Sequence, residues 1–159
     1  MPANVIAIEK LPEHLKRNDR LMGLDLGTKT IGLAVSDAER SIAAPLKTIM
    51  RNKFTQDAAE MLQIAERLGV VALIVGLPLN MDGSEGPRCQ ATHAFVRALA
   101  PLSALHVVFW DERMSTIAAE RMLIEADLSR AKRKAVIDAA AAAYILQGAL
   151  DRLRQLMRS

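Results

Sequence analysis

The fold of this chain is decided by the stretch LMGLDLGTKTIGLAVS, residues 21–36. Two apolar runs, at 21–27 and 31–36, flank a short polar segment that follows a glycine. Short apolar runs on either side of a glycine-containing turn are typical of a β-hairpin. The sequence therefore predicts a strand, a tight turn and a second strand at the start of the folded domain.

One carboxylate interrupts the first of these runs. Apolar residues flank Asp25 on both sides. A buried carboxylate is costly unless a metal ion, a cation or a hydrogen bond compensates its charge, and aspartate is a poor strand former. One interpretation is a structural carboxylate that accepts hydrogen bonds from the turn at 27–29. The other is a catalytic or metal-binding carboxylate.

The composition is that of a globular protein. The chain has 159 residues, of which 51% are hydrophobic and 25% are charged, and this suits one domain with a sizeable core. Cys89 is the only cysteine, so no internal disulfide forms, which suits a reducing cytoplasm. No apolar run is long enough to span a bilayer. We expect a soluble cytoplasmic protein without a membrane partner, and the net charge of +3 is compatible with a polyanionic partner.

The rest of the chain alternates between helix and strand patterns. Apolar residues recur at helical spacing up to Leu68, and the continuous apolar run after Gly69 is typical of a parallel strand buried on both faces. The predicted strands lie at 21–27, 31–36, 45–49, 70–76 and 105–110, and the predicted helices at 54–68, 88–99, 115–125 and 132–156. This order favours an α/β fold, with a mixed five-stranded sheet and helices on both faces. We expect a single domain at 21–159 after a partly disordered extension at 1–20, in which the apolar residues 5–8 could pair weakly or pack on the domain.

Carboxylates recur at two further places in the predicted domain. Asp111 and Glu112 directly follow the last predicted strand, and Asp138 lies on the last helix beside a mainly apolar face. The alanines at 139–143 leave room for that helix to approach the sheet, which would bring Asp138 towards the strand of Asp25. Carboxylates that converge from two strands and a helix would form an oxygen-rich site suited to Mg²⁺ or Mn²⁺. Two ions would fit if the carboxylates were shared between them.

Polar and basic side chains lie close to these acids. Thr28 and Lys29 form the turn after the first strand, and Arg113 follows the last one. Each can contact a phosphate, and the two cations can instead neutralise the acids. Four more cations precede Asp138, namely Arg130, Lys132, Arg133 and Lys134. They would lie along a phosphate backbone bound at that acid, or they form a solvated helix start.

No other group of residues competes as a catalytic centre. Cys89 has no activating partner in the sequence, and the chain lacks the Cys/His spacing of a zinc site. His93 and His106 are interpreted as structural residues. Asp82 and Glu85 are interpreted as loop residues, and a metal-binding role is the less favoured alternative.

Four blocks of the sequence carry a family resemblance. The blocks are GLDLGTK at 23–29 with IGLA at 31–34, VGLPLNMDGS at 75–84, DERMST at 111–116, and KAVIDAAA at 134–141. Together, in this order, they resemble the YqgF or RuvX family of nucleases, which is related to the Holliday junction resolvase RuvC. The resemblance covers residues from about 21 to 150 and leaves the first twenty outside.

The resemblance implies a fold, an activity and a set of site residues. The fold is ribonuclease H-like. The activity is metal-dependent phosphodiester hydrolysis that matures the 5′ end of pre-16S ribosomal RNA during ribosome biogenesis, with Holliday junction cleavage as the older proposal. The implied metal-binding catalytic set is Asp25, Glu112 with Asp111 adjacent, and Asp138.

Other functions stay open at this stage. The substrate is either structured RNA or branched DNA, and the active form is either a monomer or a homodimer. A non-catalytic RNA-binding factor of ribosome assembly would keep the carboxylates as a structural network. A phosphotransferase is a further class, because Asp25 to Thr28 also resembles the phosphate loop of sugar kinases, actin and heat-shock ATPases. Those proteins need two such domains, and this chain has one.

Overall fold

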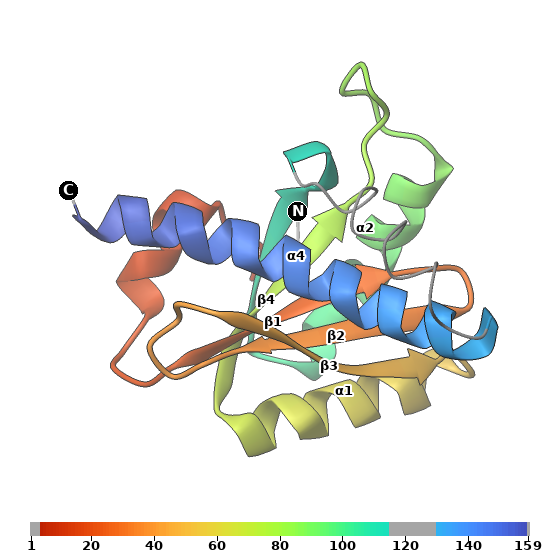
Figure 1. Cartoon of the computed structure of the whole chain (residues 1–159), viewed down its shortest axis with the longest axis horizontal. Helices are drawn as coiled ribbons and strands as arrows, with labels where there is room; N and C mark the ends of the chain where they lie inside the picture. Colours follow the sequence, from red (N-terminus) through yellow and green to blue (C-terminus); the bar gives the residue numbers. More distant parts are fainter. Residues whose placement is uncertain (1–3, 115–129, 159) are drawn as a thin grey trace.

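The fold is a single mixed β-sheet packed between helices (Figure 1). The computed structural model describes residues 4–114 and 130–158, without the side chains of 114 and 130–137. The strands are β1 (Arg20–Leu26), β2 (Thr30–Ser36), β3 (Ala43–Met50), β4 (Val70–Leu77) and β5 (His106–Asp111), in the sheet order β3-β2-β1-β4-β5. The β1–β2 and β2–β3 pairs are antiparallel, and β1–β4 and β4–β5 are parallel. The predicted mixed five-stranded sheet is confirmed.

Helices cover both faces of this sheet. The helical segments are η1 (Ile8–His14), α1 (Phe54–Leu68), α2 (Pro87–Leu99), η2 (Ala100–Leu102), η3 (Glu112–Met114) and α4 (Arg130–Arg158). One core cluster joins α1 and α2 to the sheet through large residues such as Leu24, Met61 and Phe95. The other joins α4 and η1 to the opposite face, with small residues such as Ala34 and Ala142 among its members. Figure 1 shows α4 running across its face of the sheet while α1 lies on the other side.

The long helix α4 lies unusually close to the sheet. A Cβ atom added to Gly23 would lie 2.6 Å from the carbonyl oxygen of Ala142, and one added to Gly32 would collide with the carbonyl oxygen of Asp138. The predicted close approach is therefore real, and glycines of β1 and β2 permit it as much as the alanines of the helix do. These contacts place Asp138 directly over the strand pair that carries Asp25.

The helix boundaries follow local sequence signals. Helix α1 ends at Gly69, which adopts the left-handed conformation (φ 73°) and donates its backbone N–H to the carbonyl oxygens of Ala65 and Glu66. Pro87 occupies the first turn of α2, as expected for a residue without a backbone N–H. The helix predicted at 115–125 lies outside the described residues.

The N-terminal segment differs from the expected disordered extension over its described part. Residues 4–20 fold against the domain, with Leu11 of η1 fully buried in the α4-side core. The backbone N–H of Ile6 donates to the carbonyl oxygen of Val107 (2.9 Å), and the N–H of Val107 donates to that of Asn4 (2.9 Å). The apolar residues of this segment give it enough buried surface to remain ordered.

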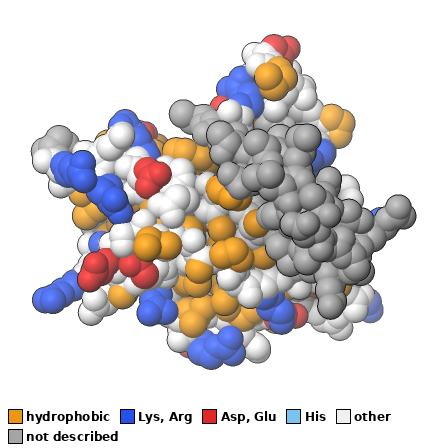
Figure 2. Space-filling view, viewed as in Figure 1, with side chains coloured by type: hydrophobic (Ala, Val, Ile, Leu, Met, Phe, Trp, Pro, Cys, Tyr) orange, Lys and Arg blue, Asp and Glu red, His pale blue; other side chains and the backbone are white. Residues whose placement is uncertain are grey.

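Strand β3 forms one edge of the sheet and is the most exposed strand. Its residues Leu46 and Met50, and Ile42 just before it, keep more than a third of their surface exposed. Figure 2 shows hydrophobic side chains gathered where Figure 1 draws this strand. Among the described helices, none combines the length and apolar character needed to cross a bilayer.

Candidate active site

Three carboxylates from three separate elements line one cavity at the carboxyl ends of β1 and β5. They are Asp25 of β1, Glu112 of η3 and Asp138 of α4, and the cavity measures about 390 Å³. Lys29 and Arg88 line the same cavity. The chain therefore brings together acids that are separated by up to 113 positions in sequence, and it adds two cations to them.

Strand alternation aims Asp25 at this cavity. Leu21 is buried on the α4 side and Met22 and Leu24 on the α1 side, so the odd-numbered positions of β1 face α4. Asp25 pairs with Gly32 across β1 and β2. The missing side chain at Gly32 leaves the space into which the Asp138 backbone fits. Asp25 is 8% exposed, a burial that places its charge in a partly desolvated site.

A hydroxyl group on the hairpin orients Asp138. The Oγ1 of Thr30, the first residue of β2, donates to the Oδ2 of Asp138 over 2.6 Å. Thr30 is itself buried, so this bond is shielded from water on one side. The β-hairpin thus supplies one carboxylate and holds another.

The adjacent acids Asp111 and Glu112 differ in surroundings. Val108 and Trp110 of β5 face α4, so alternation directs Asp111, the last residue of the strand, away from α4. Glu112 begins η3, and its side chain lies with that of Ile145 of α4 at Gly76. The carboxyl carbon of Glu112 lies 3.1 Å from the point where a Cβ on Gly76 would stand. Glu112 lines the cavity beside Asp25, and its approach depends on a glycine in β4.

Asp111 instead forms an ion pair with Arg113. The guanidinium Nη2 lies 2.6 Å from Oδ2, Nε donates to both carboxylate oxygens at 3.0 Å, and the backbone N–H of Arg113 donates to Oδ1. The side-chain hydrogen bond from Arg113 holds the pKa of Asp111 below its ordinary value. Arg113 also donates to the carbonyl oxygen of Met81, which ties the loop after β4 to the end of β5. Neither side chain lines the acidic cavity, so Arg113 neutralises an acid, the second of the two roles considered for it.

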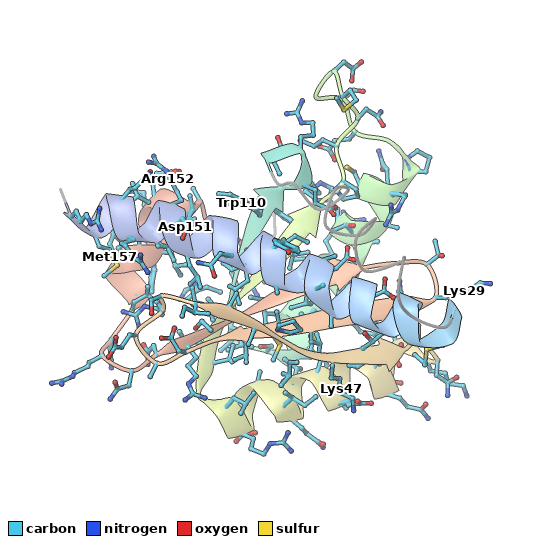
Figure 3. The ribbon with its side chains drawn as sticks, in the orientation of Figure 1. Lys29, Lys47, Trp110, Asp151, Arg152 and Met157 are labelled. Carbon is cyan, nitrogen blue, oxygen red and sulfur yellow. The ribbon has the colours of Figure 1, made fainter. Side chains whose placement is uncertain are left out.

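The predicted phosphate contacts divide into two groups. Thr28 and Lys29 are exposed and line the cavity, and Figure 3 shows Lys29 extending from the β1–β2 turn. The side chains of Arg130, Lys132, Arg133 and Lys134 lie outside the described part of the structure. Their backbone forms the first turns of α4, eight residues or fewer before Asp138.

The donor set suits a hard divalent cation. Carboxylate oxygens, assisted by a threonine hydroxyl, are the ligands that Mg²⁺ and Mn²⁺ prefer. Among the described residues, no three acidic, histidine or cysteine side chains lie close enough together to bind one metal ion without moving. The acids surround a shared cavity, so binding an ion there requires side-chain adjustment across that cavity.

The remaining candidate residues have structural roles. Asp82 accepts hydrogen bonds from the backbone N–H and hydroxyl of Ser84, which closes the loop after β4, and Glu85 pairs with His93 over 2.8 Å. Cys89 is buried, and burial raises the pKa of its thiol, which makes it a poor nucleophile.

Thr30 and Arg88 are the site residues that sequence reasoning missed. The alternation of β2 could have found Thr30, because it shares a face with Gly32 and Ala34. Arg88 sits in the first turn of α2 and donates to the carbonyl oxygen of Leu26 (3.4 Å). Only the packing of α2 beside β1 reveals its proximity to the acids.

Comparisons of sequence identify the family. A family model described as "RuvX: Holliday junction resolvase" matches residues 19–152. A protein of Methylocella silvestris is 57% identical over 98% of this chain and 97% of its own length, and one of Paracoccus denitrificans is 58% identical over 96% of each chain. Both are named "Putative pre-16S rRNA nuclease". The chain belongs to the RuvX family, and it is a nuclease by this membership.

Comparisons of structure agree on the fold. The RuvC of Thermus thermophilus, solved in complex with a Holliday junction substrate, superposes with a TM-score of 0.53 at 14% identity, over 85% of this chain and 96% of that one. A second structure of RuvC from the same organism gives 0.51, over 86% and 97%. The ribonuclease H-like fold implied by the resemblance is confirmed.

Proposed function

We propose that this RuvX-family chain is a divalent-cation-dependent nuclease that hydrolyses phosphodiester bonds of structured RNA in the cytoplasm. Its substrate would be the precursor of 16S ribosomal RNA, at the 5′ end. One observation carries the proposal, namely that Asp25, Glu112 and Asp138 line a single cavity together with Lys29 and Arg88. Acids beside cations suit a site that binds both metal ions and phosphate oxygens.

The three carboxylates would hold the cations, and two ions would fit if the carboxylates were shared. Bound there, the ions would supply Lewis-acid stabilisation of the phosphate and an activated water. Asp25 is the central ligand in this proposal, because its side chain is buried and lines the same cavity as Glu112 and Asp138. Lys29 and Arg88 would bind phosphate oxygens and orient the strand.

Two further contacts would position these groups. The Thr30 hydroxyl holds one oxygen of Asp138, and in this proposal the other oxygen binds the ion. The Asp111–Arg113 pair fixes the end of β5, so that Glu112 in the next position keeps its place over Gly76. In this proposal Asp111 is a positioning residue, and Glu112 is the ligand of the two.

The names of the two similar relatives favour RNA as the substrate, whereas the description of the family model favours DNA junctions. The proposal follows the relatives, because they match this chain over nearly its whole length. One chain carries all three carboxylates, so trimming a single strand needs no second copy. Cleavage of a symmetric junction would need a two-fold dimer.

A cleavage assay with two substrates tests the proposal. The enzyme with Mg²⁺ or Mn²⁺ is given a pre-16S RNA fragment with its 5′ extension, or a four-way DNA junction. We expect cleavage of the RNA, and a loss of about a hundredfold or more in Asp25→Asn, because a metal ligand is removed. Preferential cleavage of the junction would transfer the proposal to DNA.

The same variant tests the non-catalytic alternative in cells. A ribosome-assembly factor that only binds RNA predicts that Asp25→Asn and Asp138→Asn mature pre-16S RNA normally. The proposed nuclease predicts accumulation of the 5′-extended precursor while the variants keep the melting temperature and RNA affinity of the wild type.

A further inference from the structure

A second cavity lies on the other side of the β1–β2 turn. It measures about 450 Å³, larger than the acidic cavity. Arg51 after β3, Asn52 beside it, and Arg88, Thr92 and Phe95 of α2 line it. Gly27 and Thr28 of the turn form the wall that both cavities share.

The two cavities differ in charge. Three carboxylates line the first. Among the described residues, none lines the second, whose charged side chains are Arg51 and Arg88. Both arginines are exposed to solvent, so they can meet a ligand. A cavity with two guanidinium groups and no acid favours an anion of phosphate type.

The structure holds Arg51 in place before any ligand arrives. Its Nη1 donates to the carbonyl oxygen of Gly27 over 2.6 Å, and its guanidinium lies 5.7 Å from the centre of the Phe95 ring. Its backbone N–H donates to the carbonyl oxygen of Lys29 over 2.9 Å. A guanidinium has five N–H donors, so most of those of Arg51 remain for a ligand, at little further cost in side-chain entropy.

The cavities are connected through shared residues. Arg88 lines both of them, as do Gly27 and Thr28. A strand whose reacting phosphate lies among the acids can therefore place its neighbouring phosphate at Arg51 by crossing the turn. Phe95 is only 6% exposed and offers no ring face for a base to stack on.

We propose that this second cavity, the Arg51 cavity, binds the phosphate of the nucleotide next to the scissile one, on a single RNA strand. The inference rests on the proposed function for the occupant of the acidic cavity. It assigns Arg51 a role in backbone recognition that is independent of base sequence, as phosphate contacts generally are.

Binding without cleavage tests this inference. Anisotropy of a fluorescein-labelled single-stranded RNA is measured in EDTA over a range of salt concentrations, with wild type, Arg51→Gln and the matched control Arg67→Gln on α1. We expect Arg51→Gln to bind about tenfold more weakly, as for the loss of one charged hydrogen bond. The slope of log affinity against log salt should fall by about 0.7, the value of one phosphate contact on a single strand. Arg67→Gln should match the wild type.

A modified RNA keeps the test decisive if Arg51→Gln loses stability. A single neutral methylphosphonate is moved along an RNA just long enough to span the two cavities. It should weaken wild-type binding at the phosphates that Arg51, Lys29 and Arg88 contact, and Arg51→Lys, which keeps the charge, should show the same sensitive positions. Wild-type affinity and salt slope in a folded Arg51→Gln would overturn the inference, and so would a methylphosphonate scan without a sensitive position. Since binding is measured without divalent cations, absence of RNA cleavage would count against the proposed function and leave this result standing.

Discussion

The two faces of strand β1 differ in residue size beside the acidic cavity. Towards α1 and α2, β1 presents Met22, Leu24 and Leu26, which are large and buried. Towards α4, the same strand presents the buried Leu21, followed by Gly23 and Asp25. Large side chains give the first face, termed the stabilising face, its apolar contacts. The second face, termed the site face, also has an apolar core, and its glycines let α4 bring Asp138 to the site.

The largest expected effect belongs to the stabilising face. Leu24 is fully buried in the α1-side core, so Leu24→Ala should lower the free energy of unfolding by about 2–5 kcal/mol. Urea denaturation measures this loss. The activity of the protein that remains folded should be close to that of wild type. A loss of activity in Leu24→Ala without a loss of stability would contradict the proposed difference between the two faces.

The next effect belongs to the site face. Glu112→Gln should lower nuclease activity by about a hundredfold, because it removes a proposed ligand, while the melting temperature stays near that of wild type. Asp111→Asn is the matched control, since its carboxylate binds Arg113 and does not line the cavity. We expect the control to lose less activity than Glu112→Gln. A larger loss of activity in Asp111→Asn than in Glu112→Gln would indicate that Asp111, and not Glu112, is the ligand.

Substitution of Gly32 on the site face should lower both stability and activity. A Cβ on Gly32 would collide with the carbonyl oxygen of Asp138, so Gly32→Ala must displace α4. We expect a stability loss of about 1–3 kcal/mol, as for an overpacked core, with a loss of activity in the folded fraction. Gly86→Ala serves as control, because its added Cβ would meet nothing closer than 3.5 Å. Full activity in Gly32→Ala would mean that the close approach of α4 is not needed.

The smallest effect is a pH dependence from Asp111. Arg113 lowers the pKa of Asp111 in the folded state from its ordinary value of 3.8. The pair therefore contributes stability above about pH 3.8, and this contribution is lost as the pH falls further through the folded-state pKa. Asp111→Asn should show a shallower loss of stability with acid, measured by thermal melting between neutral pH and strong acid. If the melting temperatures of wild type and Asp111→Asn fell in parallel as the pH is lowered, the Asp111–Arg113 pair would have no stabilising role.

Local sequence patterns predicted most of the fold. The hairpin at 21–36, the glycine stop at 69 and the buried run that follows depend on neighbouring residues, and each lies where expected. The packing of residues 4–20 was only an alternative for residues 5–8, because the scattered apolar residues of this segment gain burial only through contact with β5 and α4. The parallel pairing of β1, β4 and β5 places the carboxyl ends of β1 and β5, with Asp25 and Glu112, on the same side of the sheet, and α4 brings Asp138 to them.

Sequence patterns predicted the site less completely. The direction of Asp111 was available from strand alternation, because Val108 and Trp110 have the opposite parity, whereas the position of Glu112 depends on the 3-10 turn that follows β5. Arg51 and Arg88 carry no such signal, because each reaches the turn from a segment far away in sequence and is placed by tertiary packing alone.

A crystal structure of the protein soaked with Mn²⁺ tests the central claim most directly. Anomalous scattering locates the ions without reference to activity. The account predicts Mn²⁺ density in the acidic cavity, with oxygen ligands from Asp25, Glu112 and Asp138, and loss of that density in Asp25→Asn. Saturating Mn²⁺ that leaves the cavity without density, or that binds elsewhere in the chain, would contradict it.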